Sequence, residues 1–111
     1  MDLTAERASS AIVTTDEVLT EFLTFFAAAA EPTRRETSAL VEELLRSTVI
    51  QVIPQSRESF RSGLQLYRAR PDKGYSLTDC ISMQTMKRQG LMEALTNDRH
   101  FEQEGFRALF R

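Results

Sequence analysis

The sequence contains few of the residues that several common site chemistries require. Its 111 residues include one cysteine, one histidine and no tryptophan. A single cysteine, Cys80, cannot form an internal disulfide, which fits a reducing cytoplasm. With His100 as the only histidine, a Cys/His zinc cluster is not expected, and a histidine-based catalytic triad is a weak hypothesis. Any chemistry is therefore expected from other side chains.

The chain also lacks long apolar runs and a strong excess of charge. Its longest apolar stretch, 22–30, is interrupted by Thr24 and is too short to span a bilayer. The N-terminus carries Asp2 and Glu6 and no apolar signal-peptide core. We therefore expect a cytoplasmic protein with no membrane partner. The net charge of −2 provides no overall basic field, so a polyanion would have to be held by local charge or by metal ions.

Hydrophobic periodicity predicts strands that alternate with helices in one domain, residues 1–111. Strands separated by helices indicate a parallel sheet in an α/β fold. The predicted strands lie at 11–14, 48–53, 93–96 and 106–110, with one helical turn within 97–105. Four helices are predicted. The first covers 16–30, and the second follows Pro32 with an apolar stripe of Leu40, Val41, Leu44 and Leu45. The third covers about 56–70, with Phe60, Leu64 and Tyr67 on one face, and the fourth runs from Ser76 to about Gly90.

Local signals refine the helix ends. Thr14 followed by Glu17 has the spacing of a capping box for the first helix. Ser76 followed by Asp79 has the same spacing at the start of the fourth helix. Gly90 is a natural residue to end that helix, because glycine tolerates the left-handed conformation found there.

Three carboxylates fall near element ends: Glu21, Asp79 and Asp98. Asp98 follows the predicted strand 93–96, and Asp79 lies in the first turn of its helix. Glu21 lies two turns into its helix and borders the apolar arc beside Phe25. Ligands of parallel sheets bind beyond the carboxyl ends of the strands. We therefore expect the three acids to converge there.

A cluster of carboxylates without histidine suits hard divalent cations such as Mg²⁺. Two such ions can activate a water and stabilise the leaving oxygen in phosphodiester cleavage. Each acid also has an ordinary interpretation. Asp79 is a helix-capping residue, Asp98 belongs to an Asn-Asp turn pair, and Glu21 is a solvated residue at the edge of its helix. Spacing alone leaves both interpretations open.

Longer strings resemble VapC-type PIN domains. Residues 73–80, KGYSLTDC, resemble the segment that carries the third acidic ligand of that family. Residues 93–106, EALTNDRHFEQEGF, resemble the segment of the fourth acid, and residues 13–21, VTTDEVLTE, the second strand and the helix with the second acid. Order, spacing and intervening helices agree from about residue 11 to the C-terminus, whereas residues 1–10 are unmatched.

This resemblance implies an α/β three-layer sandwich, with a parallel sheet flanked by helices. It implies a metal-dependent endoribonuclease, the toxin of a type II toxin–antitoxin pair, with RNA as substrate and a cognate antitoxin protein as partner. Glu21, Asp79 and Asp98 would be the catalytic ligands of Mg²⁺ or Mn²⁺. A homodimer is left open.

The resemblance also suggests roles for neighbouring residues. Ser76 or Thr78 would hold a ligand or a water in place, although helix capping is the simpler role for Ser76. His100 is expected to be structural. Three basic residues either contact RNA phosphates or form a solvated face, and both interpretations stay open: Lys87, Arg88 and Arg99.

The sequence departs from the family at its start. PIN domains begin with a central strand ending in an aspartate, followed by a helix, and only ten residues precede the strand predicted here at 11–14. Asp2 lies in no apolar strand, so the first acid is not assigned to it. We expect that strand and helix to be missing, which would impair RNA cleavage. The alternative function is a non-catalytic PIN remnant that binds only an antitoxin or itself, and an unrelated helical interaction module is a third hypothesis.

Overall fold

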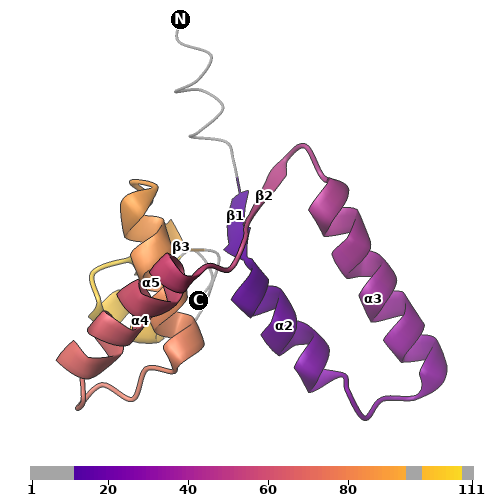
Figure 1. The fold of residues 1–111 in the computed structure, drawn as a ribbon, viewed down its shortest axis with the longest axis horizontal. Helices are drawn as coiled ribbons and strands as arrows, with labels where there is room; N and C mark the ends of the chain where they lie inside the picture. Colours follow the sequence, from indigo (N-terminus) through magenta and orange to yellow (C-terminus); the bar gives the residue numbers. More distant parts are fainter. Residues whose placement is uncertain (1–11, 95–98, 109–111) are drawn as a thin grey trace, which may run out of the picture. The chain divides into compact units, whose positions relative to one another are not determined.

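A computed structural model describes residues 12–94 and 99–108 of the chain (Figure 1). Its elements alternate between strand and helix. In chain order they are β1 (Ile12–Thr15), α2 (Asp16–Phe25), α3 (Glu31–Arg46), β2 (Ile50–Ile53), α4 (Arg57–Ala69), α5 (Leu77–Arg88), β3 (Glu93–Ala94), α6 (Arg99–Gln103) and β4 (Arg107–Ala108). Contacts divide the chain into two compact units, residues 1–54 and 55–111. Each unit is described by itself below.

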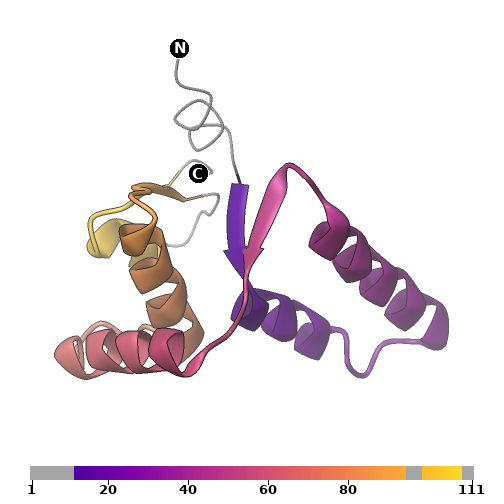
Figure 2. The same ribbon diagram turned by 45° about the horizontal axis from the view of Figure 1, so that its top comes forward.

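The first unit is a pair of parallel strands joined by two helices. β1 and β2 run side by side in the same direction, with Ile12 opposite Ile50 and Thr15 opposite Ile53 (Figure 2). Parallel neighbours cannot be joined by a tight hairpin and need a long crossover connection. α2 and α3 form that connection, and the predicted parallel pairing is confirmed.

α2 begins at Asp16 as predicted, but its cap and its last residue differ from the prediction. The N-cap is Thr15, whose Oγ1 accepts a hydrogen bond from the Val18 backbone N–H at 3.2 Å, so the predicted Thr14–Glu17 capping box is wrong. β1 extends one residue further than predicted, which moves the cap by one position. α2 ends at Phe25 instead of residue 30, because the chain turns before α3, which carries Pro32 in its first turn. The second predicted strand also begins later, at Ile50 instead of residue 48.

In the second unit, α4 and α5 approach closely at Gly63. A β-carbon placed on Gly63 would lie 2.3 Å from Cγ1 of Ile81 and 3.0 Å from its backbone N and Cα. Gln84 Nε2 donates to the Ser62 carbonyl at 3.1 Å across the same contact. Glycine is therefore required at this point by the distance between the two helices.

This close contact determines which face of α4 is buried. Its buried residues are mostly small: Ser59, Gly63 and Leu66. The periodic apolar residues that share the other face remain 37–49% exposed; they are Phe60, Leu64 and Tyr67. Phe60, Leu64 and Tyr67 thus face outward, because small residues occupy the point where α4 approaches α5 most closely, while Leu66 enters the core.

The core of the second unit lies between α4, α5 and the C-terminal segment. It consists of Leu66, Tyr75, Cys80, Met83 and Phe106, with Met86 and Phe101 packed against it. α5 ends at Arg88 and is terminated by Gly90 as predicted, because the φ of 71° at Gly90 lets the Leu91 N–H reach the Met86 carbonyl at 2.8 Å. The short strands β3 and β4 pair in parallel, with Glu93 opposite Arg107. No helix among the described residues is long and apolar enough to cross a membrane.

Candidate active site

Asp79 is fixed at the start of α5 by a reciprocal cap with Ser76. Ser76 Oγ accepts from the Asp79 N–H at 3.0 Å, and Asp79 Oδ2 accepts from the Ser76 N–H at 3.3 Å. The predicted capping box is therefore confirmed. The other carboxylate oxygen, Oδ1, has no hydrogen-bond partner among the described residues, and the side chain is 20% exposed. Capping thus holds the carboxylate in place and leaves one oxygen available to a ligand.

His100 contacts the same carboxylate. Its Nδ1 lies 3.4 Å from Asp79 Oδ2, at the long end of hydrogen-bond distances. Its ring also packs at a tilt against Tyr75, with 5.3 Å between the ring centroids. The sequence suggests only a structural role for His100, and the structure adds a direct contact with a predicted metal ligand.

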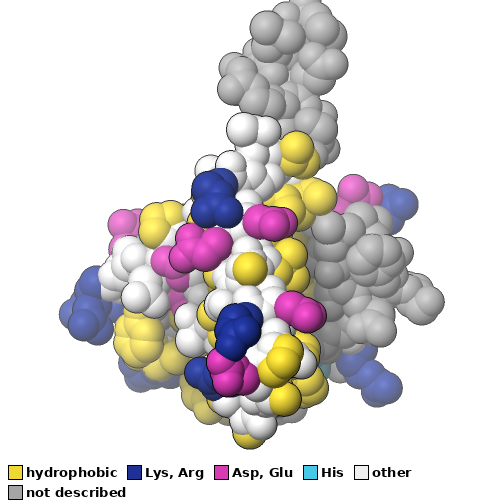
Figure 3. Space-filling view, turned by 90° about the vertical axis from the view of Figure 1, so that its right-hand side faces the viewer, with side chains coloured by type: hydrophobic (Ala, Val, Ile, Leu, Met, Phe, Trp, Pro, Cys, Tyr) yellow, Lys and Arg dark blue, Asp and Glu magenta, His cyan; other side chains and the backbone are white. Residues whose placement is uncertain are grey.

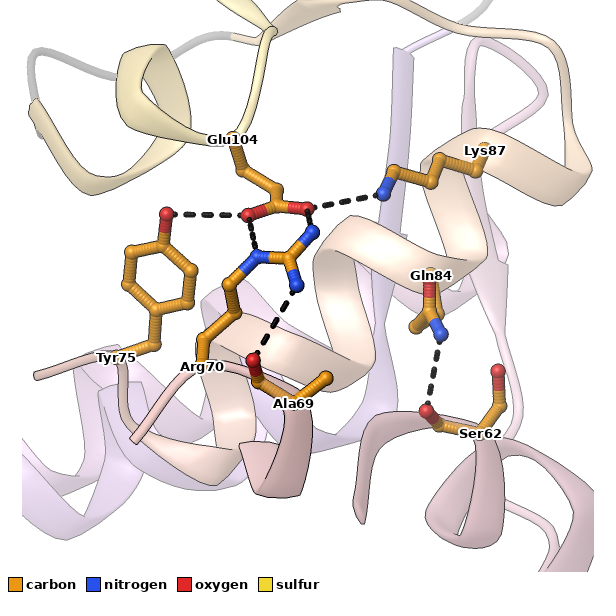
Figure 4. Close-up of polar contacts among 7 residues, drawn as sticks. All are labelled: Ser62, Ala69, Arg70, Tyr75, Gln84, Lys87 and Glu104. Atoms are coloured by element: carbon orange, nitrogen blue, oxygen red, sulfur yellow. Dashed lines mark hydrogen bonds and ion pairs between the residues drawn. The ribbon is translucent and has the colours of Figure 1, made fainter. Parts of the chain in front are cut away.

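A buried carboxylate that the sequence analysis did not single out lies just after α6. Glu104 accepts two hydrogen bonds from Arg70, at 2.9 and 3.0 Å (Figure 4). Lys87 Nζ lies 3.2 Å from its Oε2, and the Tyr75 hydroxyl donates to its Oε1 at 3.2 Å. The Glu104 side chain is only 5% exposed. We call these four residues the Glu104 cluster.

The charges of the cluster alter two pKa values. Burial alone would raise the pKa of Glu104, but hydrogen bonds and charges from Arg70 and Lys87 outweigh it and leave that pKa below its usual value. Burial, followed by the hydrogen bond to Glu104, raises the pKa of Tyr75 to about 12. At neutral pH the cluster therefore contains a carboxylate, two cations and a neutral phenol.

The Glu104 cluster fixes the segment that carries His100. Tyr75 directly precedes the cap residue Ser76 and touches both His100 and Glu104. α6 is consequently held against the start of α5, where Asp79 lies. The partners of Glu104 are up to 34 residues away along the chain, so no local periodicity could predict this cluster.

Cys80, next to Asp79, is fully buried in the core. Burial, followed by the negative charge of Asp79, raises the pKa of its thiol. A buried, protonated thiol is a poor nucleophile, so Cys80 serves packing.

The other two predicted ligands are placed differently. Glu21 lies on α2 in the first unit, is exposed and forms no ion pair with any residue of 12–94 or 99–108. Asp98 lies outside the described residues. Within the described part of the chain, no three His, Cys, Asp or Glu side chains form a group that could hold a metal. The convergence of Glu21, Asp79 and Asp98 stays a prediction.

A family model described as the PIN domain matches residues 2–106 of this sequence. The chain belongs to the PIN-domain family. The match spans both compact units and contains the three segments 13–21, 73–80 and 93–106 that resemble VapC-type PIN domains. It also includes most of residues 1–10, for which no resemblance was found by motif. None of the curated proteins matches the sequence.

The PIN fold is also evident from a solved structure. The chain is similar to the crystal structure of VapC20 from Mycobacterium tuberculosis, which is described as a sarcin–ricin-loop-cleaving toxin. The TM-score is 0.75 at 21% sequence identity, over 87% of this chain and 72% of VapC20. The α/β fold with parallel strands and flanking helices is thus that of a VapC-type PIN domain.

Proposed function

We propose that this PIN-domain protein is a metal-dependent endoribonuclease, the toxin of a type II toxin–antitoxin pair. The observation that carries the proposal is Asp79, which is held by Ser76 and His100 with one oxygen free to bind a ligand. It lies in the string that resembles the third acidic segment of VapC-type toxins. RNA and a cognate antitoxin protein are the proposed partners.

The donor chemistry fits a hard cation. Glu21, Asp79 and Asp98 offer carboxylate oxygens, which Mg²⁺ and Mn²⁺ prefer. When bound, such ions supply activation of water and stabilisation of the leaving oxygen in phosphodiester hydrolysis. Because Asp79 already has its second oxygen engaged by the Ser76 N–H, its carboxylate is oriented before any ligand arrives.

The remaining residues of the site hold the Asp79 carboxylate in position. The Ser76 cap fixes the backbone of the first turn of α5, and His100 restrains Asp79 from the side of α6. The Glu104 cluster keeps α6 in that place through Arg70, Lys87 and Tyr75. Small displacements of a catalytic group can reduce a rate about a hundredfold, so these contacts belong to the proposed function.

The test uses Asp79→Asn, because asparagine keeps a side-chain acceptor for the cap and loses the charge. We expect saturating Mn²⁺ to stabilise the wild-type protein by about 2–3 kcal/mol, since only the folded state gathers the ligands. Asp79→Asn should lose most of this stabilisation and reduce cleavage of a structured RNA by about a hundredfold or more. Thermal unfolding with and without Mn²⁺, together with gel assays of cleavage, measures both effects.

The matched control is Asp72→Asn, which makes the same charge change at an exposed turn position. It should keep the metal response and the activity of the wild type. If both variants behave alike, Asp79 is only a capping residue. A wild-type chain that neither responds to Mn²⁺ nor cuts RNA would instead favour the non-catalytic remnant.

A further inference from the structure

The outward face of α4 forms a shallow groove. All seven lining residues are exposed, and none of them is acidic: Arg57, Phe60, Arg61, Leu64, Gln65, Arg68 and Ala69. We call this surface the α4 groove. It is the face that Gly63 leaves outward by placing the small residues of α4 against α5.

The three arginines of the groove lie on one face of the helix. At 100° per residue, Arg57, Arg61 and Arg68 point within about 40° of one another and span about 16 Å along the axis. The Arg57 guanidinium also lies over the Phe60 ring, 5.6 Å from its centroid. The groove therefore presents a line of positive charge beside an aromatic ring.

Among the exposed arginines outside the groove, three form ion pairs with described residues and three, Arg34, Arg88 and Arg99, do not. Arg35 pairs with Glu31, Arg46 with Glu42, and Arg107 with Glu93. None of the three groove arginines forms an ion pair with any residue in the described ranges. Their charge remains available for a partner.

The charge of the whole second unit has the same sign. Residues 55–111 contain ten Lys and Arg against seven Asp and Glu, a net charge of +3. Residues 1–54 contain four against nine, a net charge of −5, and the two values sum to the −2 of the chain. The nearly neutral total thus conceals a basic half that contains the α4 groove.

We propose that the α4 groove binds single-stranded RNA. The arginines would contact successive phosphates, and Phe60 would offer its face to an unstacked base. The proposal extends the nuclease function by assigning a substrate-binding surface whose residues do not include the predicted carboxylate ligands. The RNA-binding proposal rests on the proposed nuclease function in one respect only, namely that the bound RNA is the substrate.

The composition of the groove favours RNA over a protein. Three of its seven lining residues are arginines, whereas two, Phe60 and Leu64, are large and apolar, so positive charge distinguishes the groove more than apolar area does. A second copy of the chain across a two-fold axis would place arginines of the same groove near one another. Phosphates satisfy the three guanidinium groups without requiring a large apolar contact.

The experiment measures the affinity for a fluorescent single-stranded RNA oligonucleotide in EDTA, over a series of salt concentrations. Without metal no cleavage occurs, so the result is independent of the carboxylate site. The test variant carries Arg57→Gln, Arg61→Gln and Arg68→Gln. The matched control carries Arg34→Gln, Arg35→Gln and Arg46→Gln on α3, which removes the same charge from a helix where acidic and basic side chains are intermixed (Figure 3).

We expect the α4 variant to bind RNA at least tenfold more weakly at low salt. The slope of log affinity against log salt should fall by about 2, since each lost phosphate contact of a single strand contributes about 0.7. The α3 control should stay within about twofold of wild type. Phe60→Leu, which keeps an apolar side chain without the aromatic face, should weaken binding about tenfold.

Equal losses in the α4 and α3 variants would overturn the proposal, because net charge would then explain the binding. An unchanged salt slope in the α4 variant would also overturn it. So would unchanged RNA affinity combined with lost binding of a co-expressed antitoxin, which would make the groove a protein-binding surface. Circular dichroism of each variant checks that it is folded.

Discussion

The two compact units are stabilised in different ways. In the second unit a cluster of five buried residues joins α4, α5 and the C-terminal segment around Met83, which is fully buried. In the first unit the described residues include only three buried ones, Thr15, Leu19 and Val41. Several large apolar residues there stay exposed: Ile12, Phe25, Leu40, Leu45 and Val49. Packing therefore stabilises the second unit, whereas the first depends more on the hydrogen bonds of its strand pair and helices.

The two units also differ in net charge and in the predicted metal ligand that each contains. The first unit is acidic and contributes Glu21, while the second is basic and contributes Asp79 within a network of fixed contacts. A rigid framework surrounds only one of these two carboxylates in the described structure. Substitutions in the second unit thus test how surrounding contacts position a carboxylate. Substitutions in the first unit test how much loss of packing the fold tolerates.

The largest expected contrast comes from truncating one buried leucine in each unit. Leu66→Ala should cost about 3–4 kcal/mol of unfolding free energy, because the cluster around it leaves a cavity. Leu19→Ala should cost no more than about 2 kcal/mol, since Leu19 is the only buried residue of α2. Urea unfolding of both variants measures the difference. Equal costs would contradict the comparison, because they would show a core of similar quality in the first unit.

A smaller contrast comes from removing one ion-paired glutamate in each unit. Glu104→Gln should cost about 2 kcal/mol at pH 7, because it leaves a buried site without its charge. Glu31→Gln should cost less than about 0.5 kcal/mol, because the Arg35–Glu31 pair is exposed. Thermal or urea unfolding at pH 7 compares them.

The sign of the pH dependence follows from the lowered pKa of Glu104. Its folded pKa lies below the unfolded value of about 4.3, so its stabilisation is complete above that value and is lost as the pH falls through the folded pKa. Below about pH 5 the wild type should lose stability faster than Glu104→Gln. Parallel curves for the two proteins would show that the glutamate is not held by its cations.

The smallest effect is expected at Phe25, which is 82% exposed on α2. Phe25→Ser should change the unfolding free energy by no more than about 0.5 kcal/mol, because little area is uncovered. The opposite case is Phe106 in the second unit, which is 3% exposed, and Phe106→Ser should be strongly destabilising. A large cost at Phe25 would contradict this expectation and would show that its edge-to-face contact with Phe26, 5.1 Å between ring centroids, contributes more than its exposure suggests.

Sequence patterns predicted the parts of the fold that depend on local chemistry. The Ser76–Asp79 cap and the Gly90 helix end are confirmed, because each needs only residues three to five positions apart. Parallel strand pairing is confirmed too, since helices between strands permit little else. The early end of α2 was missed, because the alanines after Phe26 are good helix formers and the turn depends on where α3 begins.

The candidate site was predicted less completely. The segment 73–80 was sufficient to predict Asp79 as a candidate site residue. The Glu104 cluster joins residues from three separate segments, so no sequence spacing predicts it. The exposed face of α4 was also not predictable from periodicity. Apolar residues there recur as on a buried face, and only the distance between α4 and α5 determines that small residues are buried instead.

Gly63 links the packing of two helices to the chemistry of a side chain that it does not touch. An added methyl group at residue 63 would lie 2.3 Å from the Ile81 side chain and 3.0 Å from its backbone, two residues after Asp79. The side chain of Ile81 relieves part of that contact by changing rotamer, and the tight contact with its backbone is relieved by a shift of α5, which carries the first turn with it. In the second unit, the aim of the Asp79 carboxylate is therefore adjustable from α4, by the volume of one residue on the neighbouring helix.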